Sequence, residues 1–133
     1  MDNTGIKKGS VPKILVVEDN QDNREMVVKA LKFNGYQVVE AVDGEEAIEK
    51  VKAEHPDLIL LDIFLPKMDG YEATRRLKGD TSLRNIPIIA LTAHAMKGSM
   101  EEALAAGCDG YISKPIDVRE LPKQIQHFLK PRP

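Results

Sequence analysis

Short apolar runs alternate along this chain with segments whose apolar residues recur at helical spacing. The runs predict five β-strands: Ile14 to Val17, Tyr36 to Ala41, Leu58 to Leu61, Ile86 to Leu91, and Tyr111 to Ile112. The first, third and fourth runs are almost continuously apolar. This pattern is typical of strands that are buried on both faces of a parallel sheet.

Five helices are predicted between and after the strands. The first begins after the polar cap region Asn20 to Asp22, and the second after the capping residue Asp43. The other three extend over Gly70 to Lys78, His94 to Ala105 and Asp117 to Leu129. Pro122 falls inside the last of these helices, where it removes a backbone hydrogen bond. We therefore expect a distorted first turn there and a regular helix only beyond it.

Five successive strand–helix units predict an α/β fold with a doubly wound parallel sheet and helices on both faces. The expected strand order is 2-1-3-4-5. The chain has 133 residues, which fits one domain. We assign this domain to residues 13–129, with a polar N-terminal tail at 1–12 and a proline-containing C-terminal tail at 130–133.

Composition excludes several classes of protein. The net charge of −2 has the wrong sign for a nucleic-acid-binding module, and Cys108 has no second cysteine with which to form a disulfide. No apolar run approaches the ~18 residues of a membrane span. The N-terminal segment lacks the apolar stretch of a secretory signal. We expect a cytoplasmic protein without membrane insertion, in which Cys108 is a small buried thiol.

Polar side chains follow four of the five predicted strands. Glu18 and Asp19 end the first strand, Asp62 the third and Thr92 the fourth, while the fifth runs into Lys114. In open parallel sheets, ligands bind outside the carboxyl ends of the strands, where these residues would meet. The predicted site is therefore a rim with three acids, one hydroxyl and one amine.

Each of these residues has an ordinary structural explanation. Asp19 and Thr92 fit helix caps, Asp62 fits the start of a turn, and Glu18 and Lys114 fit solvated surface positions. Taken singly, these explanations are at least as good as a functional role. Taken together, they leave unexplained why all five residues share one edge of the sheet.

The chemistry of such a set favours phosphoryl transfer. Three clustered carboxylates repel one another unless a cation lies among them, and Mg²⁺ prefers oxygen ligands. Lys114 would pair with an anion such as phosphate, and the Thr92 hydroxyl would donate a hydrogen bond to a phosphoryl oxygen. Catalysis by such a set depends mainly on positioning and charge neutralisation.

Four segments resemble the receiver domains of bacterial response regulators. They read ILVVEDN at 14–20, LLDIFLPKMDG at 60–70, IALTA at 89–93 and GYISKP at 110–115. The resemblance extends from about Lys13 to Leu129 and includes single-domain, chemotaxis-regulator-like receivers. It implies a flavodoxin-like fold and a two-component phosphorelay.

The resemblance implies a role for each acid. Asp62 would be the nucleophile that becomes an aspartyl phosphate. Asp19, Asp62 and the backbone carbonyl of Phe64 would bind Mg²⁺, or Mn²⁺, directly, and Glu18 would act through a water molecule. The protein would phosphorylate itself and lose the phosphoryl group by its own activity, without turning over an external substrate.

It also implies a conformational switch. Lys114 would pair with the phosphoryl group, and Thr92 would move to bond it together with the backbone N–H of Ala93. Tyr111 would then swing inward and remodel the face formed by the fourth helix, the fifth strand and the fifth helix. An ordinary half-buried tyrosine is the alternative for Tyr111. The Lys114–Pro115 peptide bond is expected to be cis.

Two positions bear on the lifetime of the phosphorylated state. Phe64 lies two residues after Asp62, and His94 lies two residues after Thr92, at sites that flank the attacking water in the family. Bulky Phe64 would hinder that water, so we expect slow loss of phosphate. For His94 an ordinary position at the start of a helix is preferred.

The implied partners are a sensor histidine kinase or histidine phosphotransfer protein and a downstream protein target, with no nucleic acid. The expected state is a monomer or a weak phosphorylation-dependent dimer. One alternative is a receiver from a hybrid histidine kinase or a longer regulator, although the short tails favour a protein that stands alone. Another is a haloacid-dehalogenase-type phosphatase, which would need an aspartate where Phe64 stands. A third is a degenerate receiver that only binds partners.

Overall fold

A computed structural model describes residues 11–65, 68–92 and 97–129, with the backbone alone for 97–100. In this part of the chain, five parallel strands form one sheet: β2 (Lys13–Val17), β3 (Gln37–Ala41), β4 (Leu58–Asp62), β5 (Ile88–Thr92) and β6 (Gly110–Ser113). Their order is β3-β2-β4-β5-β6. Counted along the chain, this is the predicted order 2-1-3-4-5, and the predicted fold class is confirmed.

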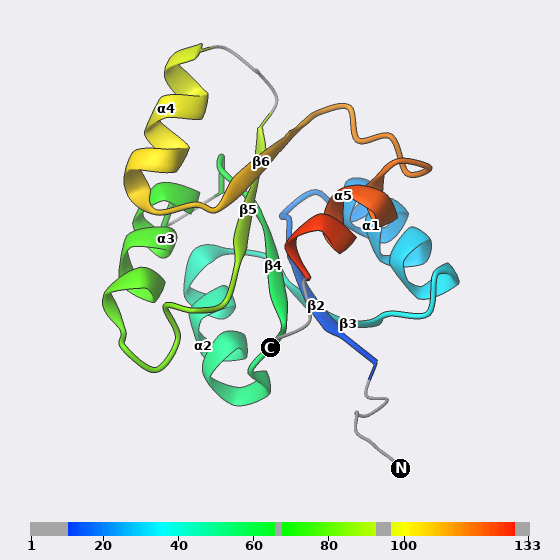
Figure 1. Ribbon diagram of the computed structural model, residues 1–133, viewed down its shortest axis with the longest axis horizontal. Helices are drawn as coiled ribbons and strands as arrows, with labels where there is room; N and C mark the ends of the chain where they lie inside the picture. The colour runs from blue at the N-terminus through cyan, green and yellow to red at the C-terminus, as the bar shows by residue number, and fades with distance from the viewer. Residues whose placement is uncertain (1–10, 66–67, 93–96, 130–133) are drawn as a thin grey trace.

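Helices cover both faces of the sheet (Figure 1). They are α1 (Gln21–Phe33), α2 (Gly44–Glu54), α3 (Gly70–Gly79), α4 (Lys97–Ala106) and α5 (Leu121–Phe128). Helices α1 and α5 lie on one face, and α2, α3 and α4 lie on the other. None of the described helices combines the length and the apolar character needed to cross a bilayer.

The alternation of side chains along each strand divides the core into two layers. Leu15 and Val17 of β2 pack in the layer that includes Ala47 of α2 and Ala73 of α3, whereas Ile14 packs with residues of α1 and α5. Every residue of β4 and β5 is buried. Their continuous apolar pattern is explained by helices on both sides.

Side-chain caps fix the helix starts beside the strand ends. Asn20 Oδ1 accepts from Asn23 N at 2.9 Å, so Asn20, and not Asp19, caps α1. Asp43 caps α2 as predicted. Asp69 Oδ1 accepts from Glu72 N at 2.9 Å at the start of α3. Because Asn20 serves as the cap, the carboxylate of Asp19 is left for another role.

Among the described residues, two predicted boundaries differ from the structure by two residues or more. The last helix begins at Leu121, after a turn in which Leu121 N donates to Asp117 O at 3.0 Å. Pro122 lies in the first turn of α5, where a helix has no use for its missing N–H. The strand β5 begins at Ile88 because Pro87 has no N–H for the ladder, although its carbonyl accepts from Ile59 N at 2.9 Å.

Candidate phosphoryl-acceptor site

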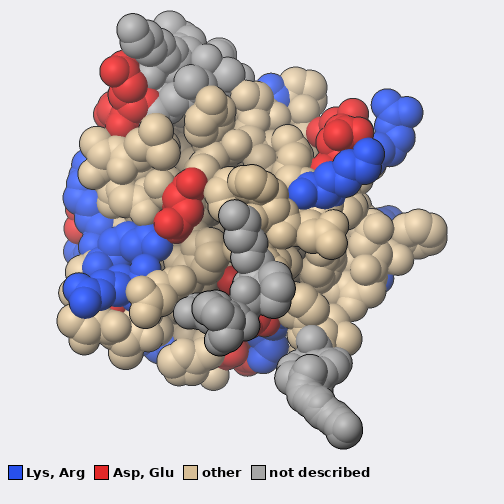
Figure 2. Space-filling view, viewed as in Figure 1, with Lys and Arg blue, Asp and Glu red and all other residues tan. Residues whose placement is uncertain are grey.

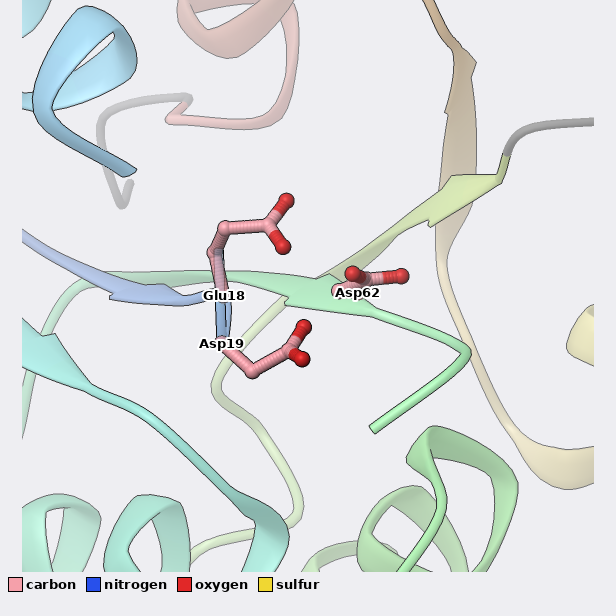
Figure 3. Close-up of side chains that lie close together, drawn as sticks. All are labelled: Glu18, Asp19 and Asp62. Carbon is pink, nitrogen blue, oxygen red and sulfur yellow. The ribbon is translucent and has the colours of Figure 1, made fainter. Parts of the chain in front are cut away.

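Three carboxylates converge at the carboxyl ends of two neighbouring strands. Glu18 and Asp19 follow β2, and Asp62 is the last residue of β4. The pairing of Val17 with Leu61 places these strand ends side by side. Carboxylate oxygens of the three residues all lie within 4.8 Å of one another. Figure 3 shows the side chains extending into the same space.

Two of the three acids, Glu18 and Asp62, share the ammonium group of Lys114. Its Nζ lies 2.9 Å from Glu18 Oε1 and 3.1 Å from Asp62 Oδ2. Glu18 and Asp62 are buried, whereas Asp19 is exposed. One positive charge beside three carboxylates leaves an excess of negative charge. A divalent cation with oxygen ligands would neutralise it. The Lys114–Pro115 peptide bond is cis, as predicted.

Burial and neighbouring charges change the pKa values of Glu18 and Lys114. Burial raises the pKa of the Glu18 carboxyl, and nearby Asp62 adds to the rise, against the opposing hydrogen bond from Lys114. Burial alone would lower the pKa of Lys114, but the hydrogen bond to Glu18 and the charge of Asp62 outweigh it and raise that pKa. The two shifts thus have different main causes, burial for the Glu18 carboxyl and the neighbouring carboxylates for the Lys114 ammonium.

The raised pKa of Glu18 predicts how acid affects the metal-free protein. In the unfolded chain, the Glu18 carboxyl has the ordinary pKa of 4.5, and in the folded protein its pKa is higher. Between these two pKa values, the folded protein binds a proton that the unfolded chain does not. The contribution of Glu18 to the free energy of unfolding therefore rises as pH falls toward 4.5. Wild type should therefore gain unfolding free energy relative to Glu18→Gln between pH 7 and pH 5. Urea unfolding in EDTA at both pH values measures this difference, and an unchanged difference would contradict the expectation.

The backbone after β4 holds Asp62 in place. Phe64 N donates to Asp62 Oδ1 at 3.1 Å, and Ile63 N donates to Leu91 O at 3.1 Å. Gly70 N donates to Ile63 O at 2.9 Å, which closes the loop onto α3. The carboxylate of Asp62 is thus oriented at both oxygens, by Phe64 N–H on one side and by Lys114 on the other.

The predicted switch residues lie on the two adjacent strands. Thr92 ends β5 and is buried, and its carbonyl accepts from Lys114 N at 2.8 Å. Tyr111 on β6 has 39% of its surface exposed, on the side of the strand opposite buried Ile112. Ala93 and His94 lie outside the described residues. The structure therefore brings Thr92 and Lys114 to the rim and holds Tyr111 outward.

Phe64 and Cys108 differ in their exposure to solvent. The side chain of Phe64 is exposed beside the acidic cluster. Cys108 is buried and lies with its Sγ 3.6 Å from Thr74 Oγ1, and burial raises the pKa of its thiol. A buried thiol with a raised pKa is a poor nucleophile, which supports the predicted structural role of Cys108.

Sequence reasoning missed two groups that hold Glu18. Asn20 N donates to Glu18 Oε2 at 3.2 Å, and Arg24 Nη1 donates to the Glu18 carbonyl at 3.0 Å. The amide of Asn20 is a consequence of the tight turn into α1. Arg24 lies in a polar stretch of helix, where nothing in the sequence distinguishes it from a solvated arginine.

A comparison with protein families matches residues 14–126 to the response regulator receiver domain. The chain belongs to this family. The polar-differentiation response regulator DivK of Brucella ovis is 43% identical over 116 residues, which cover 87% of this chain and 94% of DivK. Membership of the receiver family excludes the phosphatase alternative and confirms the resemblance seen in the four motifs.

Solved receiver structures have the same fold. The receiver domain of the Pseudomonas aeruginosa sensor histidine kinase PA1611 superposes with a TM-score of 0.84 at 38% identity, covering 90% of this chain and 98% of that one. That structure has a magnesium ion coordinated in its active-site cleft. The chemotaxis response regulator CheY4 of Vibrio cholerae gives a TM-score of 0.86 at 32% identity, over 90% and 100% of the two chains. Receivers bind Mg²⁺ at an acidic cluster, and Glu18, Asp19 and Asp62 form one here.

Proposed function

We propose that Asp62 accepts a phosphoryl group from the phosphohistidine of a sensor histidine kinase or a histidine phosphotransfer protein. An oxygen of the Asp62 carboxylate forms a bond to phosphorus as the bond from phosphorus to the imidazole nitrogen breaks, and the imidazole takes up a proton. The observation that carries this proposal is the convergence on Asp62 of two further carboxylates and the Lys114 ammonium, 3.1 Å from its Oδ2.

The donor set fits Mg²⁺, or Mn²⁺, because these hard cations take oxygen ligands. Asp19, Asp62 and the carbonyl of Phe64 would hold the ion directly, with Glu18 acting through a water molecule. When bound, the ion neutralises negative charge on the phosphoryl oxygens and the carboxylates.

The remaining groups act on the phosphoryl group. Lys114, which now bridges Glu18 and Asp62, would pair with a phosphoryl oxygen. The hydroxyl of Thr92 and the backbone N–H of Ala93 would donate to the other oxygens. The N–H of Phe64, which donates to Asp62 Oδ1, would keep the carboxylate oriented during the transfer.

Phosphorylation would be read out as a change of surface. An inward move of Thr92 would let the exposed Tyr111 turn toward the sheet, which alters the face formed by α4, β6 and α5. We propose that this face binds a downstream protein target. The protein itself would be a monomer or a weak phosphorylation-dependent dimer. On the side shown in Figure 2, acidic and basic side chains are interspersed and do not gather into one basic stripe. A cytoplasmic location belongs to the proposal, because the kinase that supplies the phosphoryl group uses ATP.

The decisive experiment is incubation with Mg²⁺ and acetyl phosphate, read by intact mass. Wild type should gain the mass of one phosphoryl group, and EDTA should prevent the gain. Asp62→Asn should show no gain while it keeps the circular dichroism spectrum of wild type. A modification that persists in folded Asp62→Asn would refute the assignment of the acceptor.

Phe64 should lengthen the life of the phosphorylated state. Its exposed ring stands two residues after Asp62, where it would hinder an attacking water molecule. Phe64→Asn should speed loss of phosphate roughly fivefold, which corresponds to about 1 kcal/mol in the barrier. The decay of the phosphorylated mass after removal of acetyl phosphate measures this.

Phe33→Asn is the matched control for that variant. Phe33 has 92% of its surface exposed and ends the 13-residue helix α1. The rise of a helix separates it from the N-terminal end of α1 by about 18 Å. Its substitution should leave the decay unchanged, and equal decay in wild type and Phe64→Asn would contradict the role given to Phe64.

A further inference from the structure

Arg24 joins the loop that carries two acids of the site to the neighbouring strand. Its Nη1 donates to the Glu18 carbonyl at 3.0 Å, and its Nε donates to Glu40 Oε1 on β3, also at 3.0 Å. The arginine side chain is only 15% exposed, although it lies on a helix with many solvated residues. A planar guanidinium with both contacts made has little freedom to move.

The carbonyl that Arg24 holds belongs to the peptide group between Glu18 and Asp19. The orientation of that peptide group sets the direction in which the chain leaves β2 toward Asp19. Glu18 N is held from the other side by Ala41 O at 3.1 Å. Asp19 itself is exposed, so packing contributes little to its position. The backbone hydrogen bonds of Glu18 therefore restrain Asp19 from the strand side, and the contacts of Asn20 restrain it from the helix side.

We infer that Arg24 is a positioning residue for divalent-cation binding, acting through the backbone of Glu18 on the carboxylate of Asp19. The inference rests on the proposed metal site formed by Glu18, Asp19 and Asp62. Groups in the second layer around a metal orient the ligands, and their loss weakens binding. Arg24 would serve this role without contacting the ion.

Charge and positioning predict opposite results for Arg24→Met. Removing a positive charge near three carboxylates should, by Coulomb attraction alone, strengthen binding of Mg²⁺. Loss of the restraint on the Glu18 carbonyl should weaken it. We expect positioning to dominate, with Mg²⁺ affinity falling roughly three- to tenfold, at the low end of what outer-layer partners contribute. The sign of the change thus decides between the two effects.

The test titrates metal-free full-length protein with Mg²⁺ by calorimetry and by amide NMR shifts. Arg76→Met is the matched control, because Arg76 Nε also lies 3.0 Å from a glutamate oxygen, that of Glu72 on α3, but is 59% exposed. Wild-type affinity is expected for this control. In Arg24→Met, the amide signals of Asp19 and Asn20 should already differ from wild type without metal.

Arg24→Lys keeps the charge and guards against a folding defect in the first variant. Lysine has a single nitrogen in place of the planar guanidinium and cannot make both contacts. The Arg24→Lys variant should therefore also bind Mg²⁺ more weakly than wild type. Affinity equal to or tighter than that of wild type, in whichever of the two variants is folded, overturns the inference while the proposed function stands. Failure of wild type itself to bind Mg²⁺ would overturn the proposed metal site together with this inference.

Discussion

Replacing Lys114 with methionine should slow phosphorylation of Asp62 by acetyl phosphate roughly 100- to 1,000-fold, the range seen when one fixed donor to a developing negative charge is removed. Methionine retains most of the apolar stem, so the loss would report on the ammonium group. The same substitution should strengthen Mg²⁺ binding, because Nζ no longer lies 2.9 Å from Glu18 and 3.1 Å from Asp62 as a competing positive charge. Opposite changes in rate and metal affinity would be the signature of this role.

The metal-free variant should also be less stable than wild type, since two buried carboxylates lose the cation between them. Addition of Mg²⁺ should therefore raise the unfolding temperature of Lys114→Met more than that of wild type. Thermal unfolding with Mg²⁺ and with EDTA measures this difference. A rate within a few-fold of wild type, or weaker metal binding, would contradict the assignment.

Lys78→Met provides the matched control. Lys78 has a side chain 19% exposed, close to the 21% of Lys114, and its Nζ lies 2.9 Å from Asp109 Oδ2. It also donates to the carbonyls of Arg84 and Ile86, so its loss should reduce stability. Because it has no contact with the acidic cluster, the phosphorylation rate of the folded protein should be unchanged.

The architecture and the location of the site were predictable because both depend on local pattern. Continuous apolar runs identified β4 and β5, and a polar residue at the end of each strand identified Asp62 and Thr92. Parallel strands bring such ends to one edge whatever the details of packing. This geometry explains why Glu18 and Asp62, 44 positions apart, could be placed together without coordinates.

The interactions that hold the site were not predictable, because they depend on distances between elements. The guanidinium of Arg24 reaches Glu40 only because α1 crosses beside β3. The sequence placed Lys114 at the rim, but it did not predict that its Nζ bridges Glu18 and Asp62. The start of α5 at Leu121 likewise depends on the turn formed by Asp117. A linear pattern specifies which face a residue occupies but not which atom it reaches.

Adding a methyl group at Gly70 should destabilise the protein by about 1–3 kcal/mol, the range for overpacked sites. A Cβ at this position would lie 2.7 Å from the Asp62 carbonyl and 2.7 Å from Ile63 Cα. These are backbone atoms at the end of β4, so relief of the clash must move the strand end that carries Asp62. Gly70→Ala should therefore lose phosphorylation rate as well as unfolding free energy, measured by urea unfolding and by mass after acetyl phosphate.

The other end of the same helix supplies the contrast. Gly79 closes α3, and a Cβ there would meet nothing within 4 Å. Alanine has the higher helix propensity, so Gly79→Ala should be neutral or stabilising by up to about 1 kcal/mol, with an unchanged phosphorylation rate. If Gly70→Ala stabilised the protein as well, close approach to the strand would not be the reason for glycine after Asp69. The opposite signs expected at the two ends of α3 separate the propensity of the helix from the space that the site requires.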